Sequence, residues 1–528
     1  MIRLLDCTLR DGGFVNDWNF GYSSIRSIVG RLDKAGIEII EVGFIDDRRE
    51  YDKNRSIFPD VISINSTLTN LSVNQALLVG MIDFGSCSLD EICLSEHSIL
   101  GGIRVIFKKK DINAALAYCS EIRAKGYKIF LNPVSLTSYS DKEILELVEK
   151  INDFNPYAMS IVDTYGLMLR SQILHYVGLI DFNLKPTITL AYHSHNNQQM
   201  AYANCCTLID YQTNRDIILD TTLYGMGKSA GNANTELVAS YTKHICGKVY
   251  KVEQLLECIY SDIMPIYKQT LWGYNLHYLL SALNDCHPSY IKFLLEKNSL
   301  NVDGIYDIVS KIPIKERLTY SETLIERLYI EYLSIEANDV ECLHKLHDRI
   351  ANRNILMICP GTTIISHKQE IDKYIEYNNP VTISVNFIPL DFCVDFAFVG
   401  NRKRYDKLMD SYFHLEKRPH IIATSNILES TVPIDYSLNY ESLILGNSAI
   451  SDYGSVMCLN LLRKLEMTKI SIAGMDGFSG GKGNFGDKFM EMYDSKDMLI
   501  ASNNKLSKFI VDLQVGINIT FLTPTSLI

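Results

Sequence analysis

The sequence lacks several features that would each point to a particular class of protein. It contains no uninterrupted apolar run of about 18 residues, which a membrane-spanning helix needs. It also lacks an excess of basic charge, since 51 Lys and Arg residues stand against 62 Asp and Glu residues, and the net charge is −11. This balance argues against nucleic-acid binding, which requires a basic face. We therefore expect neither a membrane nor a nucleic-acid partner.

Regularly spaced cysteine pairs and an apolar leader are missing as well. The thirteen cysteines show no repeated CxxC spacing, and only Cys205 and Cys206 are close together. The first residues, MIRLLDCTLRDGG, contain charges where a secretory leader needs an unbroken apolar segment. Free thiols in a reducing compartment are the simplest interpretation, and we expect a cytoplasmic protein.

With 528 residues, of which 47% are hydrophobic and 21% charged, the chain is globular and too long for one ordinary domain. Its first 225 residues alternate short β-rich runs with longer amphipathic helical patterns. The predicted strands are Ile2–Asp6, Ile37–Gly43, Leu77–Met81, Ile103–Phe107, Lys128–Asn132, Met159–Asp163, Thr187–His193 and Ile217–Thr222. Eight evenly spaced strand–helix units favour a closed (β/α)8 TIM barrel over a doubly wound open sheet.

The rest of the chain divides at a change of pattern near residue 350. Residues 246–350 are helical throughout, and β-rich runs alternate with helical patterns from residue 351 onward. We therefore predict a catalytic TIM barrel over 1–245, a helical extension over 246–350 and a smaller Rossmann-like α/β domain over 351–528. The predicted strands of that domain are Ile355–Cys359, Thr382–Asn386, Phe396–Val399, His420–Thr424, Ile470–Gly474 and Ile517–Leu522.

Catalytic groups of a barrel lie at the C-terminal ends of its strands. The seventh predicted strand ends in His193-Ser194-His195, where residues i and i+2 point to the same side. Two imidazoles with one carboxylate, for which Asp11 after the first strand is the candidate, suit a divalent ion that keeps open positions for substrate. The alternative is that both histidines only form hydrogen bonds that close the strand end.

Two further sequence features at this end of the barrel have two interpretations each. Arg10, beside Asp11, is either a structural ion-pair partner or a second positive group that stabilises an oxyanion or enolate. The glycine-rich run YGMGKSAGNANTE, residues 224–236, either offers backbone N–H groups to a carboxylate or phosphate, or allows close helix–strand packing.

Five motifs in order carry a resemblance to a known family: DCTLRDGG, IEVGF, VDTYG, HSHNN and GMGKSAGNANTE. Over about residues 1–300 the sequence resembles the metal-dependent aldolase and acyltransferase superfamily that includes 4-hydroxy-2-oxovalerate aldolase, hydroxymethylglutaryl-CoA lyase and isopropylmalate synthase. It is most similar to the aldolase-like branch. The resemblance implies that Asp11, His193 and His195 bind Mn²⁺ or Mg²⁺, with Asn232 as a further ligand.

The same resemblance implies a reaction and its substrate contacts. Arg10 matches the arginine that stabilises the enolate, and Asp163, Thr164 and Gly231 are the implied contacts to substrate. The implied reaction forms or cleaves a 4-hydroxy-2-oxo acid from a pyruvate-type 2-oxo acid and an aldehyde. Condensation of an acyl-CoA with a 2-oxo acid is the alternative within the superfamily. Because family members commonly form oligomers, the resemblance also implies a homo-oligomer.

The sequence departs from the aldolase pattern at the general base. Aldolases of this branch carry a histidine shortly after the Arg-Asp pair, but the loop reads GGFVNDWNFG and the matching position is Phe14. Asp17 is the nearest titratable replacement, and Tyr274 of the helical extension is a second candidate. The base, or the substrate, is therefore expected to differ from that of the named aldolase.

The C-terminal domain has its own candidate site. Gly361 ends one predicted strand, the basic cluster Arg402-Lys403-Arg404 follows another, and Asp476 ends a third. A nucleotide or sugar nucleotide would bind such a set at a topological switch point. Ordinary turn glycines and a solvated basic turn explain the residues equally well. If this domain carries the function, the barrel is only a scaffold.

Overall fold

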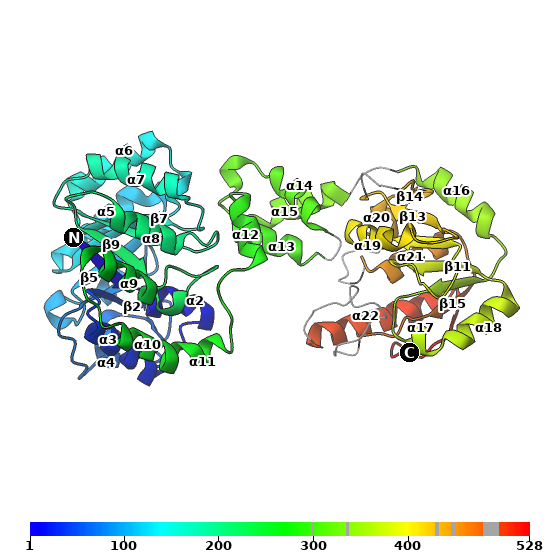
Figure 1. The fold of residues 1–528 in the computed structure, drawn as a ribbon, viewed down its shortest axis with the longest axis horizontal. Helices are drawn as coiled ribbons and strands as arrows, with labels where there is room; N and C mark the ends of the chain where they lie inside the picture. Colours follow the sequence, from blue (N-terminus) through cyan, green and yellow to red (C-terminus); the bar gives the residue numbers. More distant parts are fainter. Residues whose placement is uncertain (298–299, 334–336, 428–431, 445–449, 451, 479–495) are drawn as a thin grey trace. The chain divides into compact units, whose positions relative to one another are not determined.

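A computed structural model describes residues 1–528 except 298–299, 334–336, 428–431, 445–449, 451 and 479–495 (Figure 1). The chain forms two compact units. One comprises Met1–Lys292 with Pro313–Tyr320, and the other comprises Phe293–Ile312 with Ser321–Ile528. The predicted helical extension therefore contributes helices to both units, and the bounds of the three predicted domains stay predictions.

The first unit contains the predicted barrel. Its eight parallel strands are β1 (Ile2–Asp6), β2 (Ile39–Ile45), β4 (Leu77–Asp83), β5 (Gly102–Phe107), β6 (Lys128–Pro133), β7 (Ala158–Asp163), β8 (Thr189–Ser194) and β9 (Ile217–Thr221). They are ordered β1-β9-β8-β7-β6-β5-β4-β2, and pairing of β1 with β2 closes the sheet. The predicted TIM barrel is confirmed. A two-residue strand, β3 (Ile57–Phe58), pairs with β2 and was not predicted.

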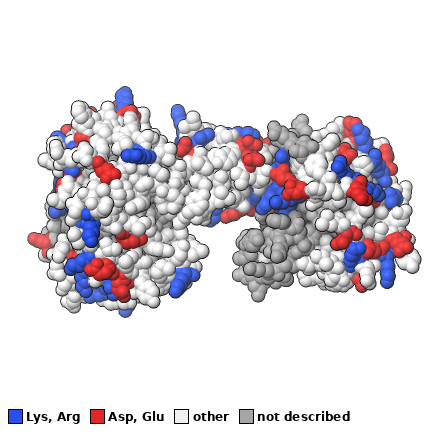
Figure 2. All heavy atoms as spheres, in the orientation of Figure 1, with Lys and Arg blue, Asp and Glu red and all other residues white. Residues whose placement is uncertain are grey.

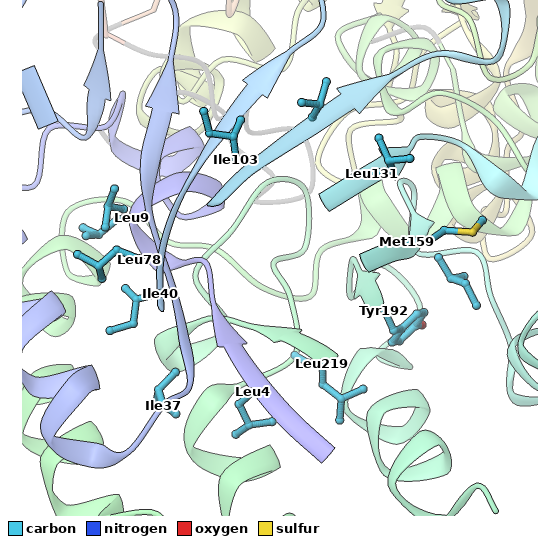
Figure 3. Packing of buried hydrophobic residues seen from close by; sticks show 14 of the residues in the cluster. Leu4, Leu9, Ile37, Ile40, Leu78, Ile103, Leu131, Met159, Tyr192 and Leu219 are labelled. Atoms are coloured by element: carbon cyan, nitrogen blue, oxygen red, sulfur yellow. The ribbon is translucent and has the colours of Figure 1, made fainter. Parts of the chain in front are cut away.

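Successive side chains of the barrel strands face opposite sides of the sheet, so apolar residues form two separate clusters. Every barrel strand contributes to a large cluster on the helix-covered side, whose labelled members include Leu4, Ile103 and Leu219 (Figure 3). Residues one position away, such as Leu5 and Phe130, form a separate small cluster on the opposite side of the sheet. Because successive side chains alternate between faces, this second set lies inside the barrel.

Amphipathic helices cover the barrel. They are α3 (Tyr22–Ala35), α4 (Val61–Thr67), α5 (Ile112–Ala124), α6 (Asp141–Phe154), α7 (Arg170–Asn183), α8 (Ala201–Asp210) and α9 (Thr235–Cys246). In α6, Ser140 and Glu143 form a reciprocal capping box, and Asn155 ends the helix in the left-handed conformation. The buried residues of α6 recur at helical spacing, so its amphipathic pattern faces the sheet as predicted.

The elements after α9 are helical up to residue 350 in the part of the chain that the structure describes. They are α10 (Val252–Cys258), α11 (Met264–Tyr267), α12 (Leu276–Leu283), α13 (Pro288–Leu295), α14 (Val302–Ser310), α15 (Glu322–Leu333) and α16 (Asp339–Ile350). None of the described helices combines the length and apolar character that crossing a bilayer requires.

The second unit contains a parallel seven-stranded sheet, as the predicted Rossmann-like domain requires. The strands are β10 (Ile355–Ile358), β11 (Val381–Val385), β12 (Phe396–Val399), β13 (His420–Thr424), β14 (Tyr436–Leu438), β15 (Lys469–Ala473) and β16 (Asn518–Phe521). Their order is β14-β13-β12-β11-β10-β15-β16, so the chain reverses direction across the sheet between β10 and β15. Strand β14, only three residues long, was not predicted.

The helices of the sheet domain are α17 (Thr363–Ser366), α18 (Lys368–Asn378), α19 (Arg402–Tyr412), α20 (Tyr440–Leu443), α21 (Gly454–Lys464) and α22 (Lys496–Gln514). Acidic and basic side chains are interspersed over the face of the molecule seen in Figure 2. All thirteen cysteines are free, as predicted.

We predict opposite effects of alanine at two barrel glycines. Gly43 of β2 has φ 150°, and a Cβ there would lie 1.9 Å from the Ser56 carbonyl oxygen. Gly43→Ala should therefore destabilise the barrel by about 2–4 kcal/mol. Gly178 lies inside α7 with open space at its Cβ position, and Gly178→Ala should stabilise the protein by about 0.5–1 kcal/mol.

The measurement is urea unfolding followed by tryptophan fluorescence. Both tryptophans, Trp18 and Trp272, belong to the first unit, so this signal reports the barrel unit without the sheet domain. Equal midpoints for the two variants would contradict the close packing at Gly43.

Candidate metal centre

One carboxylate and two imidazoles meet at the C-terminal end of the barrel strands. Asp11 lies on α1 (Thr8–Asp11), the short helix that follows β1, and His193 and His195 lie at the end of β8. One potential ligand atom of each residue lies within 4.8 Å of the others, and all three side chains are buried. The expectation that alternate residues of this strand end point to the same side is met.

Three acceptor atoms in this region have no hydrogen-bond partner. They are Asp11 Oδ1, His195 Nδ1 and Asn232 Oδ1. The Asn232 amide donates to Asp11 Oδ2 at 2.6 Å, so the asparagine belongs to the same cluster. Because buried polar atoms are normally satisfied, unsatisfied oxygen and nitrogen acceptors gathered in one place fit a cation. Carboxylate, amide and imidazole ligands suit a divalent ion such as Mg²⁺ or Mn²⁺.

Two residues of the cluster, Asp11 and His193, also belong to a closed ring of ionisable side chains inside the barrel. We call it the buried charge ring; in order of contact its members are Arg10, Glu41, Arg104, Asp220, His193 and Asp11. Arg10 Nε lies 2.7 Å from Glu41 Oε2, and Arg104 bridges Glu41 to Asp220. The ring closes through His193, which lies 3.1 Å from Asp220 and 3.4 Å from Asp11, and through a 3.4 Å pair between Arg10 and Asp11.

The ring holds more carboxylates than guanidinium groups at the candidate metal site. Its two guanidinium groups face three carboxylates, and all five of these side chains are at most 5% exposed. Burial alone would raise the pKa of Asp11, but Arg10 and the two histidines hold it well below its usual value. When His193 is neutral, the three carboxylates exceed the two guanidinium groups by one negative charge, and a buried site of this kind favours a bound cation.

The two histidines have different electrostatic surroundings. Burial lowers the pKa of His195 to about 4, so this ring is neutral and can offer a lone pair. Burial also lowers the pKa of His193, but its hydrogen bonds to Asp11 and Asp220 outweigh this and raise it. Because the Asp220 carboxylate accepts, His193 Nδ1 carries the hydrogen in their 3.1 Å contact, and Nε2 faces Asp11. This is the arrangement in which a second carboxylate orients a ligating imidazole.

Three members of the ring were not among the predicted site residues: Glu41, Arg104 and Asp220. In the sheet register each pairs laterally with an apolar residue of the inner cluster, namely Val79, Phe130 and Leu5. A charged residue in the middle of an apolar strand is the sequence signal that could have found Arg104 and Asp220. Which face it occupies depends on the register, which only the closed barrel defines.

Asp163 and Thr164, predicted to contact substrate, are engaged by backbone. Both Asp163 carboxylate oxygens accept N–H bonds from its own loop, from Leu167 at 2.8 Å and Met168 at 3.0 Å. Thr164 Oγ1 accepts from Ser135 N at 2.8 Å. In the register of β7 with β8, Val162 and not Asp163 pairs with His193, so the Asp163 side chain points away from the metal side of the sheet. Burial raises the pKa of Asp163 to about 6.

Gly231 fixes the loop that carries Asn232. It has φ 81°, and a Cβ there would lie 2.1 Å from the Gly225 carbonyl oxygen. Its own carbonyl accepts from Asn196 N at 2.8 Å. The glycine-rich run therefore needs small residues for close backbone approach, and this packing places the Asn232 amide against Asp11.

The two candidate bases, Asp17 and Tyr274, have different surroundings. Asp17 has a left-handed backbone, its side chain is 70% exposed, and it forms an ion pair with Arg55. The Asp17 side chain therefore contacts a residue of the surface loop and not the candidate metal cluster. Tyr274 lines a cleft of about 140 Å³ that Asn232 also lines. Phe14, at the position expected for histidine, packs edge-on against Trp18 and is 43% exposed.

In the sheet domain, Asp476 occupies the helix terminus where a phosphate was considered. Its carboxylate accepts from Thr363 N at 2.9 Å and from the hydroxyls of Thr362 and Thr363 at the start of α17. A Cβ at Gly361 would meet this carboxylate, so glycine is required for the contact. An anion at this terminus would be repelled by Asp476. Nucleotide binding elsewhere in the domain stays a prediction.

A closed parallel barrel with a buried aspartate and two histidines at the C-terminal ends of its strands fits a metal-dependent barrel enzyme. The sequence comparisons agree with this class. Residues 1–256 match the family model described as HMGL-like.

Individual relatives match about half of this chain. Oxaloacetate decarboxylase of Mycobacterium tuberculosis is 24% identical over 276 residues, which cover 49% of this chain and 76% of that protein. 4-Hydroxy-2-oxovalerate aldolase of Bacillus thuringiensis is 22% identical over 273 residues, which cover 50% and 77%. The solved N-terminal domain of a Bacteroides vulgatus protein is 23% identical, with a TM-score of 0.48, covering 56% of this chain and 97% of that one.

We predict that replacing one arginine of the buried charge ring destabilises the barrel unit. Arg104→Met leaves Glu41 and Asp220 buried without their shared cation, which should destabilise the barrel unit by about 3–5 kcal/mol. Tryptophan fluorescence during urea unfolding measures the change. Arg48→Met is the matched control, because Arg48 is 66% exposed in its pair with Asp46 and its loss should hardly move the midpoint. Similar midpoints for both variants would show that the ring does not stabilise the fold.

Proposed function

We propose that this protein is a divalent-metal-dependent aldolase that forms or cleaves a 4-hydroxy-2-oxo acid. The observation that carries the proposal is the buried Asp11, His193 and His195 cluster, which has acceptor atoms without a hydrogen bond and Arg10 beside it. The match of residues 1–256 to the HMGL-like family model supports a lyase or aldolase acting on a small molecule. The 2-oxo acid substrate and the choice of Mn²⁺ or Mg²⁺ are part of the proposal.

In this proposal the metal ligands are Asp11, His193, His195 and Asn232. A divalent cation bound there would polarise the keto group of the 2-oxo acid and stabilise negative charge on its oxygen. Arg10 supplies a second positive group for the enolate, and its 2.7 Å contact with Glu41 fixes the guanidinium for that task. Asp220 holds the His193 ring in one tautomer.

The proposed substrate contacts differ in how they act. Arg10 faces the reacting group directly. Asp163 and Thr164 hold the loop after β7, and Gly231 holds the loop after β9, so we propose that these three position the site through the backbone. For the proton-transfer group we favour Tyr274 over Asp17, because Tyr274 lines the cleft beside Asn232, whereas Asp17 pairs with Arg55 at the surface.

The test of the proposal is exchange of the methyl hydrogens of pyruvate for deuterium in D2O. Enolisation is common to the aldolase reactions, so this measurement does not require the aldehyde to be known. We expect exchange that depends on Mn²⁺ or Mg²⁺, and Asp11→Asn should slow it about a hundredfold or more by removing the anionic ligand. Bound Mn²⁺, counted by its effect on water-proton relaxation, should be lost in parallel.

The matched control is Asp372→Asn, the same chemical change on exposed α18 of the other unit, which should exchange like the wild type. Full exchange and full Mn²⁺ binding in Asp11→Asn would refute the site. If wild-type protein binds Mn²⁺ without exchanging pyruvate, but releases CoA from acetyl-CoA and a 2-oxo acid, the reaction is the acyl-CoA condensation instead.

A second prediction concerns the proton-transfer group. Tyr274→Phe removes only the hydroxyl, and we expect the exchange rate to fall about a hundredfold, the lower range for loss of a general acid or base. Mn²⁺ binding should be retained, which separates this loss from damage to the metal site. If Asp17→Asn loses exchange and Tyr274→Phe keeps it, the base is Asp17.

A further inference from the structure

The cleft beside the candidate metal centre is lined by neutral groups of two kinds. Carboxamides come from the loops after β8 and β9, namely Asn196, Gln199, Asn232 and Asn234. Aromatic rings come from Tyr224, from Tyr267 at the end of α11, and from the segment after α11, which supplies Trp272 and Tyr274. Within the part of the chain that the structure describes, no charged side chain lines this cleft. Its ligand is therefore expected to be uncharged where it contacts these residues.

The aromatic rings on the cleft, which we call the aromatic wall, hold one another in fixed positions. Tyr267 and Trp272 pack edge-on with ring centroids 4.7 Å apart, and Tyr224 packs on Tyr267 at 5.2 Å. The Trp272 indole N–H donates to the Tyr224 carbonyl at 3.1 Å. Tyr224 itself has φ 53°, a conformation that an aromatic residue keeps only when its surroundings enforce it. The wall thus offers fixed ring surfaces on which C–H groups of a ligand can pack.

The carboxamides of the cleft keep polar atoms available for a ligand. Asn196 Oδ1 accepts from Ala201 N, but its Nδ2 has no hydrogen-bond partner among the described residues. The same is true of Gln199 Oε1, whose Nε2 donates to the Asn196 carbonyl, and of Asn234 Oδ1, whose Nδ2 donates to Glu236. The cleft therefore offers both a donor and acceptors, which is what hydroxyl groups need because each both donates and accepts.

We infer that this cleft binds a neutral polyhydroxylated chain, and that it is the subsite for the aldehyde half of the reaction. The inference rests on the proposed aldolase function and adds the class of the second substrate, a short hydroxylated aldehyde. Asn232 connects the two sites, since it lines the cleft and also donates to Asp11. A chain held here has its carbonyl end next to the proposed site of the enolate, so a carbon–carbon bond can form between them.

Binding is tested first without turnover, by saturation-transfer NMR with ribitol as a neutral polyol and 1,5-pentanediol as the chain with fewer hydroxyls. We expect transfer to ribitol at least fivefold stronger than to pentanediol. Gln199→Met keeps the side-chain length and removes the amide, and it should lower the ribitol signal severalfold. Gln212→Met, the same change at an exposed position outside the cleft, should leave the signal unchanged. Equal transfer to ribitol and to 1,5-pentanediol would overturn the inference, and so would equal ribitol signals for the Gln199→Met and Gln212→Met variants.

Turnover gives the second readout. With pyruvate as the 2-oxo acid, kcat/KM of the wild-type protein for erythrose should exceed kcat/KM for butanal and for succinic semialdehyde. Gln199→Met should lower kcat/KM for erythrose about five- to tenfold, while kcat/KM for butanal should hardly change. Preference for the anionic semialdehyde would overturn the inference. If pyruvate does not exchange but ribitol still binds, the proposed aldolase function is wrong and the inference of a polyol-binding cleft stands. If pyruvate exchanges but ribitol does not bind, only the inference about the cleft is wrong.

Discussion

The active end of this barrel depends on compensation among buried charges. Two arginines, three carboxylates and a histidine lie in a closed sequence of contacts inside the sheet, where none of the charges is hydrated by bulk water. Each charge alone would cost several kcal/mol to bury, and only its two neighbours in the ring make burial tolerable. The geometry of the candidate metal ligands follows from this, because Asp11 and His193 are members of the ring and cannot reorient without breaking it.

The barrel interior holds two kinds of side chain with different tasks. Apolar residues such as Leu5 and Phe130 fill part of the space, as in an ordinary hydrophobic core. Beside them in the sheet register lie the ionisable side chains of Glu41, Arg104 and Asp220, which belong to the same ring as two of the candidate ligands. The loops that follow the strands then add backbone contacts, of which those of Asp163 and Gly231 are the clearest. Neighbouring residues of the same sheet therefore serve the candidate site and the stability of the fold.

The sequence allowed much of this to be predicted, for identifiable reasons. All eight barrel strands were found because apolar runs separated by amphipathic helices are local patterns, whereas β3 and β14 were missed because two or three residues carry no periodicity. His193 and His195 were found because alternate residues share a face. Asp163 was placed at the right strand end, but its side chain points to the other face, and that depends on the register with β8. Arg104 and Asp220 become meaningful only when strands far apart in sequence are brought into contact.

The closure of the barrel has a consequence for the order of events during biosynthesis. Ile2 of the first strand pairs with Ile217 of the last, and the buried charge ring takes members from α1, β2, β5, β8 and β9. A nascent chain that has not yet emerged as far as β9 lacks Asp220, and its remaining ionisable groups stay hydrated. Desolvation of the ring and closure of the sheet therefore occur in one late, long-range step. The candidate metal cluster joins residues of α1 and β8, whose strands are connected through β9, so the cluster is assembled only when the barrel is complete.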